Sequence, residues 1–191
     1  MRIIGGACAG LILEAPKGLG VRPTPDLVRQ AVFNSLAGRV LDARVLELFG
    51  GTGALSLECL SRGAANATCI ELSPKHARFI EKNFAATRLP PETFRLRIQD
   101  VFTALPQLAA DAAQFDLIVA DPPFGDKNVG RRSTSLSQRL LDDADLPKLI
   151  APGGLFVLGH TKRDTLTLTA AWEETKVMKH GDSMMRFLKC A

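Results

Sequence analysis

The chain has 191 residues and a formal net charge of +4, and 46% of its residues are hydrophobic against 23% charged. This composition is typical of a globular domain with enough apolar residues for a full-sized core. No apolar run approaches the roughly 18 residues of a membrane helix, and the N-terminus has no long apolar core, so we expect neither a membrane anchor nor a signal peptide.

The first 21 residues contain glycines between two short apolar segments, and they predict an N-terminal β-hairpin extension. The following stretch "RPTPDLVRQAVFNSLAG" predicts a helix. Thr24 can cap this helix, Pro25 suits its first position and Gly38 ends it. We expect a second unit, residues 22–191, to form the main domain.

From Arg44 onward, apolar strand patterns alternate with helical ones. The predicted strands cover residues 44–49, 66–72, 94–98, 115–120, 153–160, 172–179 and 183–190. The predicted helices cover 54–63, 75–86, 101–110 with an interruption at Pro106, and 135–150. This order predicts a mostly parallel seven-stranded sheet with helices on both faces and a C-terminal antiparallel hairpin, a Rossmann-like α/β fold. Ligands of such sheets bind beyond the carboxyl ends of the strands.

The first strand leads into a glycine turn, "ELFGGTG", and then into a helix. Glycines let a ligand approach the backbone, and the helix start offers free N–H groups. A dinucleotide-binding motif would need a third glycine, but Ser56 stands at that position. A tight turn without a ligand remains the alternative for this motif alone.

Two acidic residues end the next strands. Glu71 lies eighteen residues beyond Gly53, where a carboxylate can accept the ribose hydroxyls of NAD or of S-adenosylmethionine (AdoMet). Asp100 could accept from an adenine amino group, with Val101 or Phe102 against the ring, or it could cap the following helix. Both roles are compatible for Asp100.

The strand "FDLIVA" ends on Asp121, Pro122, Pro123 and Phe124. Two prolines cannot continue a sheet, and they hold a rigid extended turn. Such a turn presents the Asp121 carboxylate and a prolyl carbonyl as two acceptors beside the flat face of Phe124. This combination suits a planar ring that carries an NH₂ group, whereas a purely structural turn accounts for the prolines alone.

These motifs, together with "MRIIGGACAG", "RPTPDLVRQAVFNSL" and "HGDSMMRFL", resemble the RsmD-like 16S rRNA guanine-N2 methyltransferases, which are class I AdoMet-dependent enzymes with a D-P-P-F motif. The resemblance runs nearly from end to end. It implies AdoMet contacts from Glu47, Phe49, Gly50, Gly51, Gly53, Glu71, Leu72, Asp100 and Val101, and handling of the target base by Asp121, Pro122, Pro123 and Phe124.

The sequence departs from the family pattern at two positions. Glu47 stands where the first motif more often has Asp, and Ser73 replaces the second acid of an E-x-D pattern. Neither change touches the D-P-P-F turn. We expect at most a weaker affinity for AdoMet.

The resemblance also implies a partner, 16S rRNA in a small ribosomal subunit or its assembly intermediate, and local basic clusters agree with a polyanion. The residues predicted to contact RNA are Arg2, Lys17, Arg22, Lys127, Arg131 and Arg132. The alternatives are methylation of adenine N6 or of a protein glutamine, an NAD-dependent oxidoreductase, and a non-catalytic rRNA-binding assembly factor. We expect a cytoplasmic monomer that binds AdoMet. We expect no metal site, because the four cysteines lie far apart in the sequence.

Overall fold

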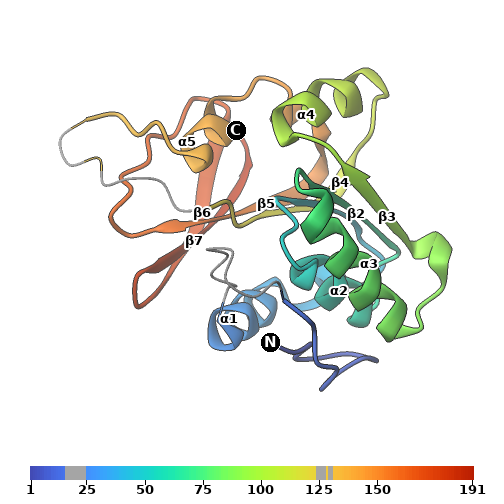
Figure 1. The fold of residues 1–191 in the computed structure, drawn as a ribbon. Helices are drawn as coiled ribbons and strands as arrows, with labels where there is room; N and C mark the ends of the chain where they lie inside the picture. Colours follow the sequence, from blue (N-terminus) through green and yellow to red (C-terminus); the bar gives the residue numbers. More distant parts are fainter. Residues whose placement is uncertain (16–24, 124–127, 129–130) are drawn as a thin grey trace.

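The computed structural model describes residues 1–15, 25–123, 128 and 131–191, and its centre is a seven-stranded sheet (Figure 1). The strand order is β3-β2-β1-β4-β5-β7-β6, in which β1 to β5 are parallel and β7 is antiparallel to both β5 and β6. The strands are β1 (Arg44–Leu48), β2 (Asn66–Glu71), β3 (Phe94–Ile98), β4 (Phe115–Ala120), β5 (Ile150–Thr161), β6 (Trp172–His180) and β7 (Ser183–Cys190). The predicted Rossmann-like α/β fold with a C-terminal antiparallel hairpin is confirmed.

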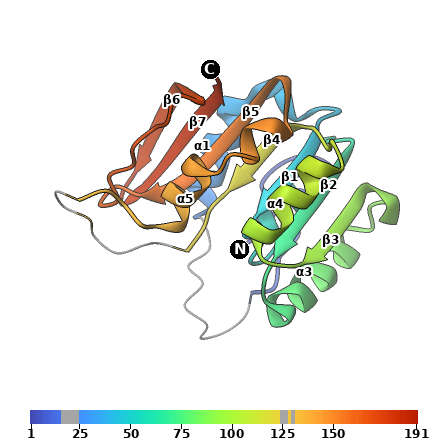
Figure 2. The ribbon, with the colours of Figure 1, turned by 90° about the horizontal axis from the view of Figure 1, so that it is seen from above.

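Helices cover both faces of this sheet. Helices α1, α2 and α3 lie on one face, and α4 and α5 lie on the other (Figures 1 and 2). The helices are α1 (Asp26–Leu36), α2 (Ala54–Ser61), α3 (Pro74–Thr87), α4 (Val101–Ala110) and α5 (Leu136–Asp142), with short 3₁₀ turns η1 (Ala37–Val40), η2 (Pro91–Thr93) and η3 (Leu146–Leu149).

The central strands are buried on both sides because successive side chains alternate between the two faces. Val45 and Val157 pack with α1 and α2, whereas Leu46 and Leu158 pack with α4 and α5. All four are at most 1% exposed. This alternation accounts for the nearly continuous apolar runs by which the strands were predicted.

The single helix expected over residues 135–150 is wrong. Helix α5 ends at Asp142, η3 begins at Leu146, and Ile150 already belongs to β5. The Asp143 carboxylate accepts hydrogen bonds from the backbone N–H groups of Asp145 and Leu146, each at 2.9 Å. Because Asp143 caps η3 in this way, and Pro147 lacks an N–H, the chain turns instead of continuing the helix.

Helix α4 also differs from the prediction, since it runs through Pro106 without interruption. Pro106 is the sixth of ten residues in this helix, and its missing N–H removes a single intrahelical hydrogen bond. At α1, Pro25 is the residue that precedes the helix rather than its first member. The predicted cap Thr24 lies outside the described residues.

The N-terminal segment is tied to α2. Its two expected strands are reduced to one antiparallel bridge, between Arg2 and Ile12. The buried Glu58 carboxylate of α2 accepts from the N–H groups of Ile4 and Gly5 at 2.7 and 2.9 Å. Ile3 is also buried in the core that α1 and α2 share. The segment is therefore part of the packed domain.

Within the described parts of the chain, no helix is both long and apolar enough to cross a membrane. Those same parts contain no group of three or more His, Cys, Asp or Glu side chains that could hold a metal ion.

Candidate active site

One row of residues crosses the carboxyl edge of the sheet. The last paired residues are Leu48 with Ile70 and with Ala120, and Ala120 with Leu158. One residue further along each strand lie Glu71 (β2), Phe49 (β1), Asp121 (β4) and Gly159 (β5), and we call these four residues the row at the carboxyl edge. Neighbouring strands lie about 4.8 Å apart, so the glycine turn after β1 and the acid after β4 are direct neighbours.

This row crosses the point where the strand order reverses, between β1 and β4. At such a point the chain leaves the two strands toward opposite faces, to α2 on one side and α5 on the other. In open α/β sheets such a reversal point is the usual ligand site. The strand ends that were predicted to meet at one edge do so, and this edge is the candidate site.

The glycine turn is shaped both by backbone conformation and by close packing. Gly53 has φ +74°, and the non-glycine Phe49 has φ +61°, a sparsely populated region for a residue with a side chain. A methyl group on Gly50 would overlap Cys69 Sγ and lie 3.1 Å from Ile80 Cδ1. Gly50 thus lets the turn pack against β2 and α3, which leaves the helix start free to face a ligand.

Glu71 joins this turn to the next one. Its Oε2 accepts from the N–H of Gly51 at 2.7 Å, and its Oε1 accepts from the N–H of Ser73 at 2.8 Å. His76 Nδ1 also lies 3.4 Å from Oε1. A carboxylate has about four acceptor positions, so capacity remains for a ribose hydroxyl. Leu72 beside it is 63% exposed and offers an apolar surface. Ser73, one of the two departures, caps α3 by accepting from the N–H of His76.

Glu47 is held inside the protein. It is 2% exposed, and its two oxygens accept from the N–H groups of Leu55 and Ser56 at 3.3 and 3.0 Å. Burial raises the pKa of this carboxyl from 4.5 to about 7, although the hydrogen bonds from Ser56 partly oppose the shift. Glu47 therefore anchors the start of α2 behind the glycine turn.

We expect Glu47→Gln to raise the melting temperature at pH 8 relative to the wild type, and to lose that advantage near pH 5. Because the folded pKa lies above the unfolded one, the native state binds the proton more tightly, and wild-type stability falls as pH rises from about 4.5 to about 7. Such a shift corresponds to on the order of 3 kcal/mol. Parallel pH curves for the two proteins in scanning calorimetry would contradict this expectation.

The adenine side of the candidate site begins at Asp100, which caps α4 by accepting from the N–H of Thr103 at 3.1 Å. Val101 is buried in the core, so the half-buried Phe102 is the side chain that presents a flat surface. Phe49 meets Phe102 edge to face, with ring centroids 6.2 Å apart. The Arg139 guanidinium lies 3.8 Å from the Phe102 ring centroid, a cation–π contact that sequence reasoning did not detect.

The corner after β4 consists of a half-buried Asp121, a buried Pro122 and an exposed Pro123. The acid lies at the sheet edge between Phe49 and Gly159, and the prolines end the strand as their chemistry requires. Phe124, the predicted stacking residue, lies outside the described residues.

The predicted RNA-contacting residues are only partly described. Arg2 is exposed, and its guanidinium lies 3.6 Å from the carboxylate of Asp26. Arg132 is paired with Asp142 at 2.6 Å, whereas Arg131 makes no ion pair within the described part of the chain. Lys17, Arg22 and Lys127 lie outside the described residues.

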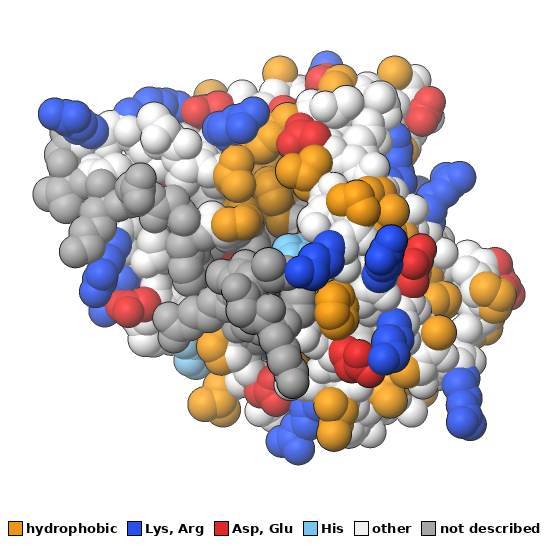
Figure 3. All heavy atoms as spheres, viewed as in Figure 1, with side chains coloured by type: hydrophobic (Ala, Val, Ile, Leu, Met, Phe, Trp, Pro, Cys, Tyr) orange, Lys and Arg blue, Asp and Glu red, His pale blue; other side chains and the backbone are white. Residues whose placement is uncertain are grey.

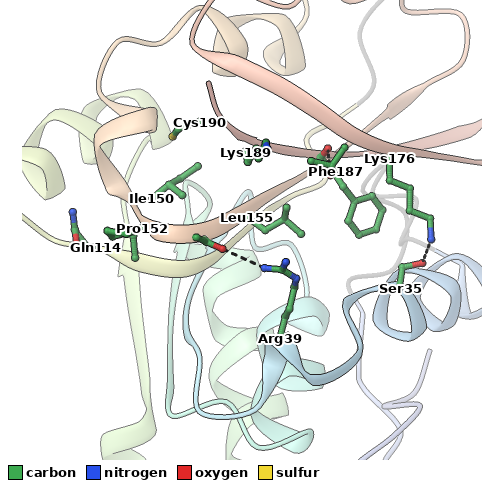
Figure 4. A pocket seen from close by; sticks show the side chains of 14 residues that line it. Ser35, Arg39, Gln114, Ile150, Pro152, Leu155, Lys176, Phe187, Lys189 and Cys190 are labelled. Carbon is green, nitrogen blue, oxygen red and sulfur yellow. Dashed lines mark hydrogen bonds between the residues drawn. The ribbon is translucent and has the colours of Figure 1, made fainter.

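A cavity of about 580 Å³ lies elsewhere, where β5 begins and meets η1, β6 and β7 (Figure 4). Its three cations are already engaged. Arg39 donates to the Gly153 carbonyl at 3.2 Å, Lys176 donates to Ser35 at 2.9 Å, and Lys189 is paired with Glu173 at 3.1 Å. Since Ile150 to Leu155 form the start of β5, this cavity is at the opposite end of the sheet from Asp121. It is separate from the candidate site.

The strand order 3-2-1-4-5-7-6, the glycine turn after β1 and the acidic corner after β4 define the class I methyltransferase fold. The family model described as "Conserved hypothetical protein 95" matches residues 1–189. The chain therefore belongs to this family, and the resemblance to the RsmD-like rRNA methyltransferases is confirmed.

Three relatives illustrate the similarity. Over 124 residues the chain is 40% identical to "Ribosomal RNA small subunit methyltransferase D" of Escherichia coli (strain K12), a match that covers 65% of this chain and 60% of that protein. It is 28% identical over 169 residues to "Putative rRNA methyltransferase YlbH" of Bacillus subtilis (strain 168), covering 88% and 87%. The solved structure of "Putative methyltransferase yhhF from Escherichia coli" superposes with a TM-score of 0.79 and 30% identity, covering 100% of this chain and 97% of that one.

Proposed function

We propose that the protein transfers a methyl group from AdoMet to the exocyclic 2-amino group of a guanine in small-subunit rRNA. The observation that carries the proposal is the row at the sheet edge, in which Glu71, the turn after Phe49, and Asp121 are neighbours across three adjacent strands. In this row Glu71 would bind the nucleoside, the glycine turn would hold the cofactor with its backbone, and Asp121 would accept the target amine.

The residues present fit AdoMet. Glu71 keeps acceptor capacity for the ribose, Asp100 and the Phe102 face suit an adenine, and the turn from Gly50 to Gly53 brings the start of α2 to the same edge. When bound, AdoMet would supply the electrophilic methyl group. Glu47 would act from behind the turn, by holding the N-terminus of α2 in place.

Asp121 would handle the target amine. The lone pair of an exocyclic amine is delocalised into the ring, which makes the nitrogen a poor nucleophile. An Asp121 carboxylate and a prolyl carbonyl that accept its two hydrogens favour a pyramidal nitrogen and direct the lone pair outward. The rigid Pro122–Pro123 turn keeps both acceptors in place, so the contribution is positioning and electrostatic stabilisation. The base would be flipped out or already unpaired, and stacked on Phe124.

An RNA substrate is supported by the charges and by the relatives' names, which include rRNA methyltransferases. On the face shown in Figure 3, Lys and Arg side chains lie among hydrophobic ones. We propose that residues 1–21 contact the RNA through Arg2, Lys17 and neighbouring Arg22, and that Lys127, Arg131 and Arg132, which follow Asp121 in the sequence, contact it as well. A monomer is proposed as the active form.

The function is tested by incubating the protein with methyl-labelled AdoMet and small ribosomal subunits that lack the modification, followed by digestion to nucleosides. We expect labelled 2-methylguanosine. Labelled N6-methyladenosine, label in protein glutamine, or no transfer would each contradict the proposal and would point to the corresponding alternative. Naked 16S rRNA in a parallel reaction identifies which form of the substrate is recognised.

For the RNA contact, we expect Arg131→Glu to weaken binding to small-subunit rRNA and to lower the slope of log affinity against log salt by about 1, because one phosphate contact is lost. The matched control is Arg95→Glu, which makes the same charge change at an exposed position of β3, three residues before the row. Equal effects of the two variants in a salt series would show that only net charge matters.

A further inference from the structure

Gly159 lies beside Asp121 in the row at the carboxyl edge. A methyl group built on Gly159 would overlap Asp121 Oδ1, and it would lie 2.9 Å from Asp121 Cγ and 3.3 Å from its Cα. These are the three nearest atoms, so the side chain of Asp121 occupies the space that any other residue at position 159 would fill.

A glycine in the interior of a strand is unfavourable by roughly 0.5–1 kcal/mol relative to alanine, and it commonly marks a place where another group approaches closely. Gly159 belongs to the twelve-residue strand β5, and it pairs with Met185 of β7. The residues on either side, Leu158 and His160, are buried. No turn or positive φ requires a glycine at this position.

The backbone of β5 is fixed where the overlap would occur. The Gly159 carbonyl accepts from Ser137 Oγ of α5 at 3.2 Å. Strand β5 is paired with β4 up to Leu158 and with β7 through Gly159 to Thr161. A side chain at position 159 would therefore displace the Asp121 carboxylate rather than the strand. Rotation of the short Asp121 side chain relieves the overlap with Oδ1 and Cγ and changes the direction of the carboxylate. The Asp121 Cα, at 3.3 Å, then has to shift by only a few tenths of an ångström, so the cost in stability is small.

We propose that Gly159 is a positioning residue for Asp121: the missing side chain lets the carboxylate lie over β5 in the orientation in which it accepts the target amine. This inference rests on the proposed function, since it assigns Gly159 a role in the same reaction. A displacement of about 1 Å in a reacting group can lower a rate by about 100-fold.

The test compares Gly159→Ala with Gly154→Ala in the full chain. At Gly154, in the same strand but at its other end, a methyl group would meet the backbone oxygens of Ala151 and Asp116 at 2.8 and 3.1 Å. We expect Gly159→Ala to lower the single-turnover rate on unmethylated small subunits by about 100-fold, with the melting temperature and the AdoMet affinity close to wild type. We expect Gly154→Ala to lower the melting temperature more and to retain the rate of its folded fraction.

The same two substitutions in an Asp121→Ala background separate this inference from the proposed function. If Gly159 acts through Asp121, Gly159→Ala causes no further loss of rate in that background. A wild-type rate for Gly159→Ala, an equal loss in both backgrounds, or a loss that merely follows a lower melting temperature would overturn the positioning role, even if Asp121→Ala shows its expected loss of about 1000-fold. A near-normal rate for Asp121→Ala would instead remove Asp121 from the reaction, and the positioning role with it. Absence of labelled 2-methylguanosine from the wild-type reaction is the result that would overturn the proposed function itself.

Discussion

Replacement of Asp121 by alanine is expected to lower kcat for methyl transfer by about 1000-fold while the affinity for AdoMet stays close to that of the wild type. The acid ends β4 in the row with Phe49 and Gly159. In the proposed reaction its carboxylate accepts from the amine as the nitrogen becomes nucleophilic, and loss of one such electrostatic group typically costs a factor of 10²–10³. AdoMet would be held by Glu71 and the glycine turn, which the substitution leaves intact.

The measurement is single-turnover methyl transfer combined with calorimetric titration of AdoMet. The matched control is Asp116→Ala, since Asp116 lies in β4, the strand that leads to Asp121, and is bonded to Arg44 through both carboxylate oxygens. That ion pair is half-exposed and contributes little to stability, so the control should retain its rate. A near-normal kcat for Asp121→Ala would remove this residue from the mechanism.

The second large effect is expected at Glu71. We predict that Glu71→Ala weakens AdoMet binding by about 10- to 100-fold, the range that corresponds to loss of a hydrogen bond to a charged group. The substitution also removes the acceptor that joins the N–H groups of Gly51 and Ser73, so the turn loses its connection to β2. At saturating AdoMet, kcat should fall much less than the affinity.

The control for Glu71→Ala is Glu81→Ala, which removes an acid from an exposed position of the following helix α3. It should leave the AdoMet affinity unchanged. If both variants bind AdoMet like the wild type, Glu71 has only a structural role, and the ribose would have to be recognised by another group at the sheet edge.

Much of the fold followed from local patterns. The bounds predicted for β3 and β4 agree with the structure to the residue, because each is a short run that ends in a polar or proline-rich turn. Ser73 and Pro74 predicted the start of α3 for the same local reason. The alternation of strands and helices then placed the strand ends at one edge, and with them Glu71 and Asp121.

Other features depend on contacts between distant residues, which a single sequence does not display. The break between α5 and η3 results from the capping bonds of Asp143, and the docking of residues 1–15 results from the buried Glu58. Glu47 was expected to contact the cofactor directly. It is buried instead, because the start of α2 packs over it and donates two backbone N–H groups to its carboxylate.

Gly159 is an intermediate case. A glycine inside the apolar run "GGLFVLGH" indicates that another group lies close to the backbone at this position. That this group is Asp121 follows only from the register of β4 and β5. The roles proposed for Phe124, Lys17, Arg22 and Lys127 stay predictions, since these residues lie outside the described part of the chain.

The central claim is that the carboxyl edge of the sheet, between β1 and β4, binds both the nucleoside and the target amine. A crystal structure of the protein with S-adenosylhomocysteine tests it most directly. We expect ribose oxygens within hydrogen-bond distance of Glu71 and the sulfur on the side of the ligand that faces Asp121. A ligand in the cavity lined by Arg39 and Lys176, or an Asp121 carboxylate turned away from the sulfur, would contradict it.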